Sequence, residues 1–245
     1  MNYKSAISRY LARTGFSHTD PRAALIDMDG TLYDSMVNHT AAWYRLMTEA
    51  GIECRRDEFY LYEGMTGAAT INKLFLRGFG RDATPAEKED LYHLKTQYFK
   101  ELPGVERMPG ALEMVTAMRD HGLKRVLVTG SGQNSLINRL AVDFPGLFSD
   151  DLRITSRDVT HGKPNPEPFQ KAMGLAGVEP WQSIVVENAP LGVEAGVRSG
   201  AFTVAVTTGP IPREAMAAAG ADLIFPSMAA FAAALPALLA QLTDN

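Results

Sequence analysis

Short apolar runs that end in polar or glycine-containing turns recur along this chain, and each is followed by a segment with helical periodicity. A parallel sheet produces this alternation, because consecutive parallel strands are joined by helical crossovers. The runs predicted as strands lie at 23–26, 125–129, 152–155, 183–187, 202–206 and 222–225, with the last at an edge of the sheet. The sequence therefore predicts an α/β fold with a doubly wound parallel sheet.

A long stretch without a convincing strand separates the first of these runs from the second. From about residue 38 to 102 the apolar residues have helical spacing, as at Trp43, Leu46 and Met47. This stretch is too long for a simple crossover, so we predict a separate helical insertion. The chain is accordingly divided into an α/β core of residues 1–36 and 104–245 and an insertion of residues 37–103. The Ala-rich tail at 216–242 predicts closing helices around the edge strand.

Composition excludes several classes of protein. The 24 basic and 28 acidic residues give a formal net charge of −4, which provides no electrostatic footprint for nucleic acid or an anionic membrane. No apolar run approaches the roughly 20 residues that span a bilayer. Cys54 stands alone, which excludes a disulfide framework and favours a reducing cytoplasm. The basic N-terminus predicts a short helix packed on the core rather than a targeting peptide. We expect a monomer or weak homo-oligomer that acts on a small molecule.

Two carboxylates follow the first predicted strand directly, at Asp27 and Asp29. Side chains two residues apart on a strand point to the same side, here at the end where open α/β sheets bind ligands. Two adjacent anions need a cation or a proton between them. Gly30 and Thr31 then predict a tight turn with free backbone amides, which would suit an anion. An acidic strand-to-loop turn without a ligand is the alternative.

Three further segments near strand ends carry polar residues. The turn after the second run is suited to phosphate oxygens, although helix N-capping is the commoner use of such a turn. A lysine after the third run is held between a glycine and two prolines, whereas a solvated surface charge is the usual role of a lone lysine. A carboxylate–amide pair at the end of the fourth offers oxygen ligands to a hard cation. These residues are Thr129, Gly130 and Ser131, then Lys163, and finally Glu187 and Asn188.

Together these groups form a coherent phosphoryl-transfer site. An ionised nucleophile must approach an anionic phosphate, and Mg²⁺ with one lysine would remove the repulsion between them. The chain has no Walker-type loop, so the strand ends must cradle the phosphate.

The motifs DMDGT, VTGS, GKPNPEPF and VVENAPLGVEAG, in this order, resemble those of the haloacid dehalogenase superfamily over residues 20 to 225. The helical insertion looks like the cap domain of the beta-phosphoglucomutase-like subfamily. The resemblance implies that Asp27 is a nucleophile forming an aspartyl-phosphate and that Asp29 is the general acid and base. It also implies that Thr129 holds the phosphate with nearby amides and that Lys163 pairs with Asp27 and the phosphate.

The resemblance further implies that Mg²⁺ is held by Asp27, the backbone carbonyl of Asp29, Glu187 and Asn188. This chain departs from the family's pattern at Asn188, where a second acid is common. An amide oxygen ligates Mg²⁺ but brings no charge. Glu63, in a loop that aligns with the family's substrate-specificity loop, would supply the missing acid if it were not merely a solvent-facing turn residue.

Three more residues of the insertion are candidates. His39 follows the turn after the first strand and would orient Asp29, or else would simply lie on a helix face. Lys95 and Arg77 would give positive charge to the substrate, although cations on helix surfaces are commonly just solvated.

The specificity loop separates the possible reactions. A sugar-phosphate mutase binds two phosphates, yet the chain has no Arg or Lys from Leu61 to Ile71. Hydrolysis through an aspartyl-phosphate is therefore favoured, with inorganic pyrophosphate as the sharpest substrate candidate and a small sugar or polyol phosphate as another. The dehalogenase branch is disfavoured, because Asp29 supplies the acid/base residue that phosphotransferases need. A beta-phosphoglucomutase-type mutase and a non-catalytic binding protein on the same scaffold remain the alternatives.

Overall fold

The computed structural model describes residues 2–132 and 134–244 of the chain, and its centre is a six-stranded parallel sheet. The strand order is β3-β2-β1-β4-β5-β6. Their bounds are Ala23–Ile26 (β1), Lys124–Val128 (β2), Arg153–Ile154 (β3), Ser183–Glu187 (β4), Phe202–Val206 (β5) and Leu223–Phe225 (β6). The predicted doubly wound sheet is confirmed, and all six predicted strands are present.

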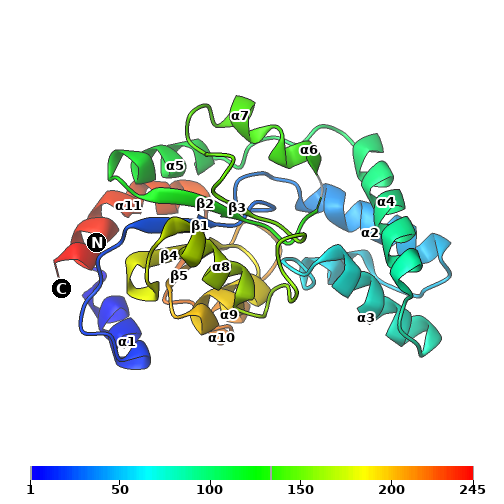
Figure 1. Ribbon diagram of the computed structural model, residues 1–245, viewed down its shortest axis with the longest axis horizontal. Helices are drawn as coiled ribbons and strands as arrows, with labels where there is room; N and C mark the ends of the chain where they lie inside the picture. Colours follow the sequence, from blue (N-terminus) through cyan, green and yellow to red (C-terminus); the bar gives the residue numbers. More distant parts are fainter. Residues whose placement is uncertain (1, 133, 245) are drawn as a thin grey trace.

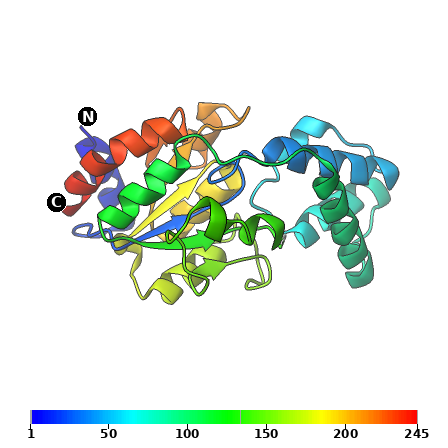
Figure 2. The ribbon, with the colours of Figure 1, turned by 90° about the horizontal axis from the view of Figure 1, so that it is seen from above.

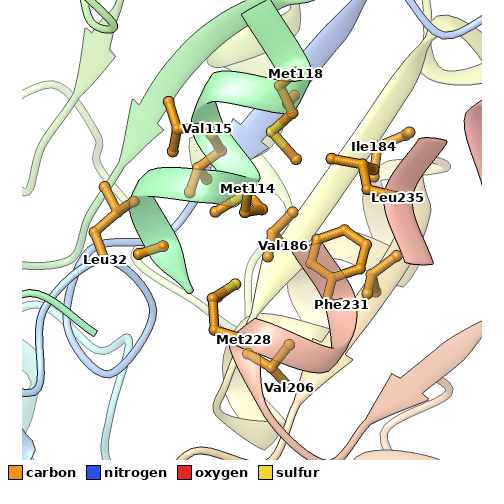
Figure 3. Packing of buried hydrophobic residues seen from close by; sticks show 14 of the residues in the cluster. Leu32, Met114, Val115, Met118, Ile184, Val186, Val206, Met228, Phe231 and Leu235 are labelled. Carbon is orange, nitrogen blue, oxygen red and sulfur yellow. The ribbon is translucent and has the colours of Figure 1, made fainter. Parts of the chain in front are cut away.

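Helices cover both faces of this sheet (Figure 1). One face packs against α5 (Ala111–Asp120) and α11 (Met228–Thr243), and the other against α8 (Glu167–Ala176) and α9 (Pro190–Ser199). Side chains of β1 alternate between the two layers: Ile26 joins the first cluster and Leu25 the second. Because both faces are covered, the central strands are continuous apolar runs. Figure 3 shows the first layer, where α5 and α11 meet over the sheet.

Shorter helices complete the core. The N-terminal helix α1 (Lys4–Thr14) buries Ala6, Ile7 and Tyr10, and the hydroxyl of Tyr10 donates to the Gly200 carbonyl at 2.9 Å. The predicted packed N-terminal helix is thus present. The remaining core helices are α6 (Asn134–Ile137), α7 (Leu140–Asp143), the 3₁₀ turn η2 (Pro180–Gln182) and α10 (Arg213–Ala218). Within the described part of the chain, no helix has the length and apolarity that crossing a membrane requires.

Residues 37–103, which we call the cap, lie beside the α/β layers (Figure 2). Their elements are α2 (Met36–Glu49), the 3₁₀ helix η1 (Arg56–Tyr60), α3 (Gly67–Phe79) and α4 (Pro85–Glu101). These elements enclose a small apolar core of their own, which contains Trp43, Phe59 and Leu74. Thr84 and Glu87 fix the start of α4 through a capping box, because each side chain accepts from the other residue's backbone amide.

The strand order determines where polar residues meet. β1 lies between β2 and β4, and the chain proceeds outward in opposite directions from this point. Loops leaving the carboxyl ends of β1, β2 and β4 therefore surround one crevice, the place where open α/β sheets bind ligands.

Candidate active site

Lys163 joins two buried carboxylates at the crevice. Its ammonium donates to Asp27 Oδ1 and to Glu187 Oε1, each at 2.6 Å, and to the Val128 carbonyl at 3.0 Å. Asp27 follows β1 and Glu187 ends β4, so neighbouring strands position both acids. The predicted pairing of Lys163 with Asp27 is present. Burial alone would lower the pKa of Lys163, but the two carboxylates raise it above its ordinary value.

The second carboxylate oxygen of Asp27 is buried and accepts no hydrogen bond from any described residue. Burial raises the pKa of Asp27 to about 8, with a further contribution from Glu187 and an opposing one from Lys163. An unpartnered buried anion is costly, so this oxygen is suited to a cation or an electrophile supplied from outside the chain.

Asp29 contacts two side chains, one in the first cap helix α2 and the other at the N-cap of that helix. Ser35 Oγ donates to Asp29 Oδ1 at 2.6 Å, and His39 Nε2 lies 2.9 Å from the same oxygen. Lys95 Nζ lies 2.6 Å from His39 Nδ1, so the neutral imidazole accepts from Lys95 and donates to Asp29. Burial would raise the pKa of Asp29, but His39, Ser35 and Lys95 together hold it below its ordinary value. His39 therefore contacts Asp29, which agrees with the first of the two roles that the sequence left open.

The two cap cations named from the sequence have different surroundings. Lys95 is 2% exposed and lies near the rings of Trp43 and Phe99, and burial lowers its pKa to about 7. Arg77 instead forms a half-exposed ion pair with Glu58 at 2.7 Å and does not line the crevice. Lys95 thus belongs to the site, whereas Arg77 does not supply charge there.

The cap acid Glu63 reaches the fourth motif. Its Oε1 accepts from Asn188 Nδ2 at 2.8 Å, and both residues are buried. Burial raises the pKa of Glu63 well above its ordinary value, and Asp27 adds to the effect. Gly30 permits this approach, because a Cβ there would lie 1.9 Å from Asn188 Nδ2 and 2.9 Å from Glu63 Oε1. Glu63 is therefore part of the site and not a solvent-facing turn residue.

The prediction of free amides after Asp29 is wrong. The Gly30 amide donates to the Tyr33 carbonyl at 2.8 Å, and the Thr31 amide faces the Met28 carbonyl at 3.4 Å. The tight turn uses these amides internally, so Gly30 contributes room for its neighbours and not an anion seat. The turn after β2 does face the crevice, where Thr129, with Gly130 and Ser131, lines the cavity.

The cavity in the crevice is small, about 60 Å³. Acidic, basic and hydroxyl groups share its wall with aromatic side chains of the cap. The polar lining residues named from the sequence are Asp27, Asp29, His39, Glu63, Lys95, Thr129 and Ser131.

A divalent cation is compatible with some of the predicted ligands. The described residues contain no group of three or more His, Cys, Asp or Glu side chains arranged to hold a metal. Glu187 already accepts from Lys163 and from the Asn188 amide, so its role as a ligand stays a prediction. Asp27, Asn188 and Glu63 carry the hard oxygen donors that Mg²⁺ prefers, and Asn188 contacts Glu63 directly.

The comparison with known families agrees with this arrangement. Residues 24–206 match the model of the haloacid dehalogenase-like hydrolase family. The chain belongs to this family. A validoxylamine A 7′-phosphate phosphatase from Streptomyces hygroscopicus subsp. limoneus is 30% identical over 205 residues, covering 83% of this chain and 92% of that protein. Hexitol phosphatase A of Escherichia coli (strain K12) is 28% identical and covers 74% and 81%.

A solved structure from Bacteroides vulgatus, described as a candidate beta-phosphoglucomutase, is 44% identical, with a TM-score of 0.94 over 99% of this chain and 98% of that one. The family assignment and the beta-phosphoglucomutase-like subfamily are thus confirmed.

Ser35 and Tyr92 are among the residues of this family member's site that were not singled out from the sequence. Ser35 holds Asp29, and Tyr92 lines the cavity. Tyr92 lies three residues before Lys95 and hence on the same side of α4. Once Lys95 was a candidate, this spacing could have pointed to Tyr92 as a second residue of the site. Ser35 gave no comparable signal, because its contact depends on how α2 leaves the β1 turn.

Proposed function

We propose that this protein is a Mg²⁺-dependent phosphohydrolase that acts on a small phosphorylated substrate through an aspartyl-phosphate. The observation that carries the proposal is the free Oδ2 of Asp27, buried next to Lys163. Membership of a hydrolase family and relatives named as phosphatases support it.

In the first step Asp27 Oδ2 attacks the phosphorus, and the bond from phosphorus to the leaving oxygen breaks. That oxygen takes a proton from Asp29. The approaching phosphate anion raises the pKa of Asp29 and so favours its protonated form. Lys163 neutralises the charge that collects around Asp27, while the hydroxyl of Thr129 orients the phosphoryl oxygens.

In the second step Asp29 accepts a proton from water, and the resulting hydroxide oxygen attacks the phosphorus of the aspartyl-phosphate. The bond from phosphorus to Asp27 breaks, and inorganic phosphate is released. His39 and Ser35 keep the carboxylate of Asp29 in one orientation for both steps. Mg²⁺, held by Asp27, the Asp29 carbonyl and Asn188, would supply charge neutralisation between nucleophile and phosphate.

Inorganic pyrophosphate is the substrate that we favour. The cavity is small, and the buried Glu63 beside Asn188 adds an acid where a second ligand charge is otherwise missing. A small sugar or polyol phosphate is the second candidate, because two of the relatives are named as phosphatases of such compounds.

A beta-phosphoglucomutase-type mutase is the alternative reaction, favoured by the 44% identity to a candidate mutase. Against it, the cap loop from Leu61 to Ile71 carries Glu63 and no Arg or Lys, and Lys95 on α4 is engaged with His39. A non-catalytic binding protein would have no need of the paired Asp27 and Lys163.

The test is phosphate release from pyrophosphate, hexitol phosphates and sugar phosphates, with Mg²⁺ and with a chelator. We expect turnover that Mg²⁺ supports and that Asp27→Asn lowers by at least about a thousandfold. Glu63→Ala should reduce the preference for pyrophosphate. Absence of turnover in the parent protein would contradict the enzymatic reading. Conversion of beta-glucose 1-phosphate to glucose 6-phosphate faster than phosphate release would establish the mutase instead.

A further inference from the structure

A second and larger cavity, about 710 Å³, adjoins the catalytic one between α4 and the loops that follow β2 and β3. Among the described residues, Gly67 and Tyr92 line both cavities. The two spaces are therefore neighbours separated at Tyr92.

Tyr92 is fixed in this position by contacts to the cap and to the core. Its hydroxyl accepts from the Gly132 amide at 2.9 Å, in the turn that carries Thr129. Its ring lies against Gly67 so closely that a Cβ there would be 2.2 Å from ring atoms Cδ2 and Cε2. The Trp43 ring lies 6.2 Å away, measured between centroids. A ring held on these sides is a fixed boundary between the two cavities and not a mobile surface side chain.

The larger cavity, which we call the basic groove, is suited to anions. Lys88, Tyr92, Thr96 and Lys100 recur every four residues along α4 and so share one face of the helix. Arg157 lies on the core side and donates to the Gly132 carbonyl at 3.5 Å. Lys88, Lys100 and Arg157 form no ion pair within the described part of the chain, and Glu89 is the acid that lines the groove with them.

We propose that Tyr92 is a specificity-determining residue: its ring ends the catalytic cavity and excludes leaving groups that would extend into the basic groove. This inference rests on the proposed phosphohydrolase function. The groove adjoins the catalytic cavity at Tyr92, so a leaving group that extends past this ring would enter the groove. With the ring removed, the groove becomes a leaving-group subsite that prefers an anionic substituent.

The experiment compares acetyl phosphate, a compact substrate, with 1-naphthyl phosphate, a bulky one. Tyr92→Ala should shift the ratio of kcat/KM toward the bulky substrate by about tenfold or more, because a filled pocket discriminates by size. Tyr98→Ala is the matched control: it removes a tyrosine ring from the same helix that lines neither cavity, and the ratio should stay within about twofold of the parent's. An equal ratio in Tyr92→Ala and Tyr98→Ala would overturn the proposal.

Binding separates this inference from the catalytic one. In the Asp27→Asn background, calorimetry should show that Tyr92→Ala improves the affinity for 1-naphthyl phosphate relative to inorganic phosphate. If no variant releases phosphate, the proposed function fails, while the binding ratio still decides the role of Tyr92. Tyr92→Leu, which keeps apolar volume but loses the reach of the ring, should give an intermediate shift and serves if the alanine variant does not fold.

Charge in the groove is tested with 4-carboxyphenyl phosphate and phenyl phosphate. In Tyr92→Ala, the carboxylated compound should be favoured, and adding Arg157→Ala should reduce this preference by about threefold or more. A preference that is the same with and without Arg157 would remove the anionic part of the proposal.

Discussion

Lys163 places one positive charge between two buried carboxylates that would otherwise repel each other. Replacing it by Met would leave the charges of Asp27 and Glu187 buried without a compensating cation. We expect Lys163→Met to lower the free energy of unfolding by about 3–5 kcal/mol, because the remaining charges lose their compensation. Urea denaturation without Mg²⁺ measures this change in the free energy of unfolding. Arg77→Met, which breaks a half-exposed ion pair, should cost about 1 kcal/mol or less. Equal losses in the two variants would contradict the expectation.

Lys95 makes stability depend on pH in a predictable direction. The folded protein holds the pKa of Lys95 at about 7 because of burial, whereas the unfolded chain has the ordinary value of 10.5. Between these values the unfolded state binds more protons, so this residue makes the free energy of unfolding rise with pH.

Comparison with Lys95→Met isolates this contribution from that of Asp27, whose raised pKa acts in the opposite direction below about 8. From pH 7 to 9.5 the parent should gain stability relative to the variant, as measured by denaturation at each pH. A difference that does not change with pH would show that Lys95 does not titrate in this window.

At the scale of elements, the cap loop after η1 lies directly on the turn after β2. A Cβ at Gly130 would be 2.5 Å from the Gly64 carbonyl oxygen and 2.8 Å from that of Met65. Gly130 has no positive φ, so alanine would be tolerated by the backbone and would act only by separating the loop from the turn.

We therefore expect Gly130→Ala to lower kcat/KM by about tenfold or more, since small displacements of aligned groups are costly in catalysis. The free energy of unfolding should change by less than about 1 kcal/mol. The control is Gly174→Ala in α8, where a Cβ would meet nothing within 4 Å, so activity should be retained. Full activity in Gly130→Ala would mean that the loop and turn move apart freely.

Elements differ in how far the sequence determines them. The strands were predictable because burial on both faces leaves continuous apolar runs with polar ends, as at β4 with Glu187. Convergence of Asp27, Lys163 and Glu187 followed from the general geometry of parallel sheets. The burial of Lys95 and the position of Tyr92 depend instead on how α4 docks, which no local pattern encodes. The internal use of the Gly30 amide was missed because turn closure competes with ligand binding for the same donor.

At the scale of the whole molecule, the site lies at the boundary of the cap and the core. Hydrogen bonds that cross this boundary include those between His39 and Asp29, between Asn188 and Glu63, and between the Gly132 amide and Tyr92. Each of them involves a residue that lines the catalytic cavity or neighbours its acids. These contacts join the cap to the core at the site, so we expect a change of charge at the boundary to alter how the cap sits on the core.

Asn188→Asp tests this coupling. The substitution replaces the amide donor to Glu63 by a second carboxylate, and like charges in contact cost several kcal/mol. At pH 9 without Mg²⁺, where the two acids are least able to share a proton, we expect the cap to open and the radius of gyration in small-angle scattering to increase. Mg²⁺ should reverse the increase, because a cation between the carboxylates turns repulsion into attraction. Adding Glu63→Gln should restore compactness without metal, and an unchanged radius in Asn188→Asp would show that Glu63 does not control closure.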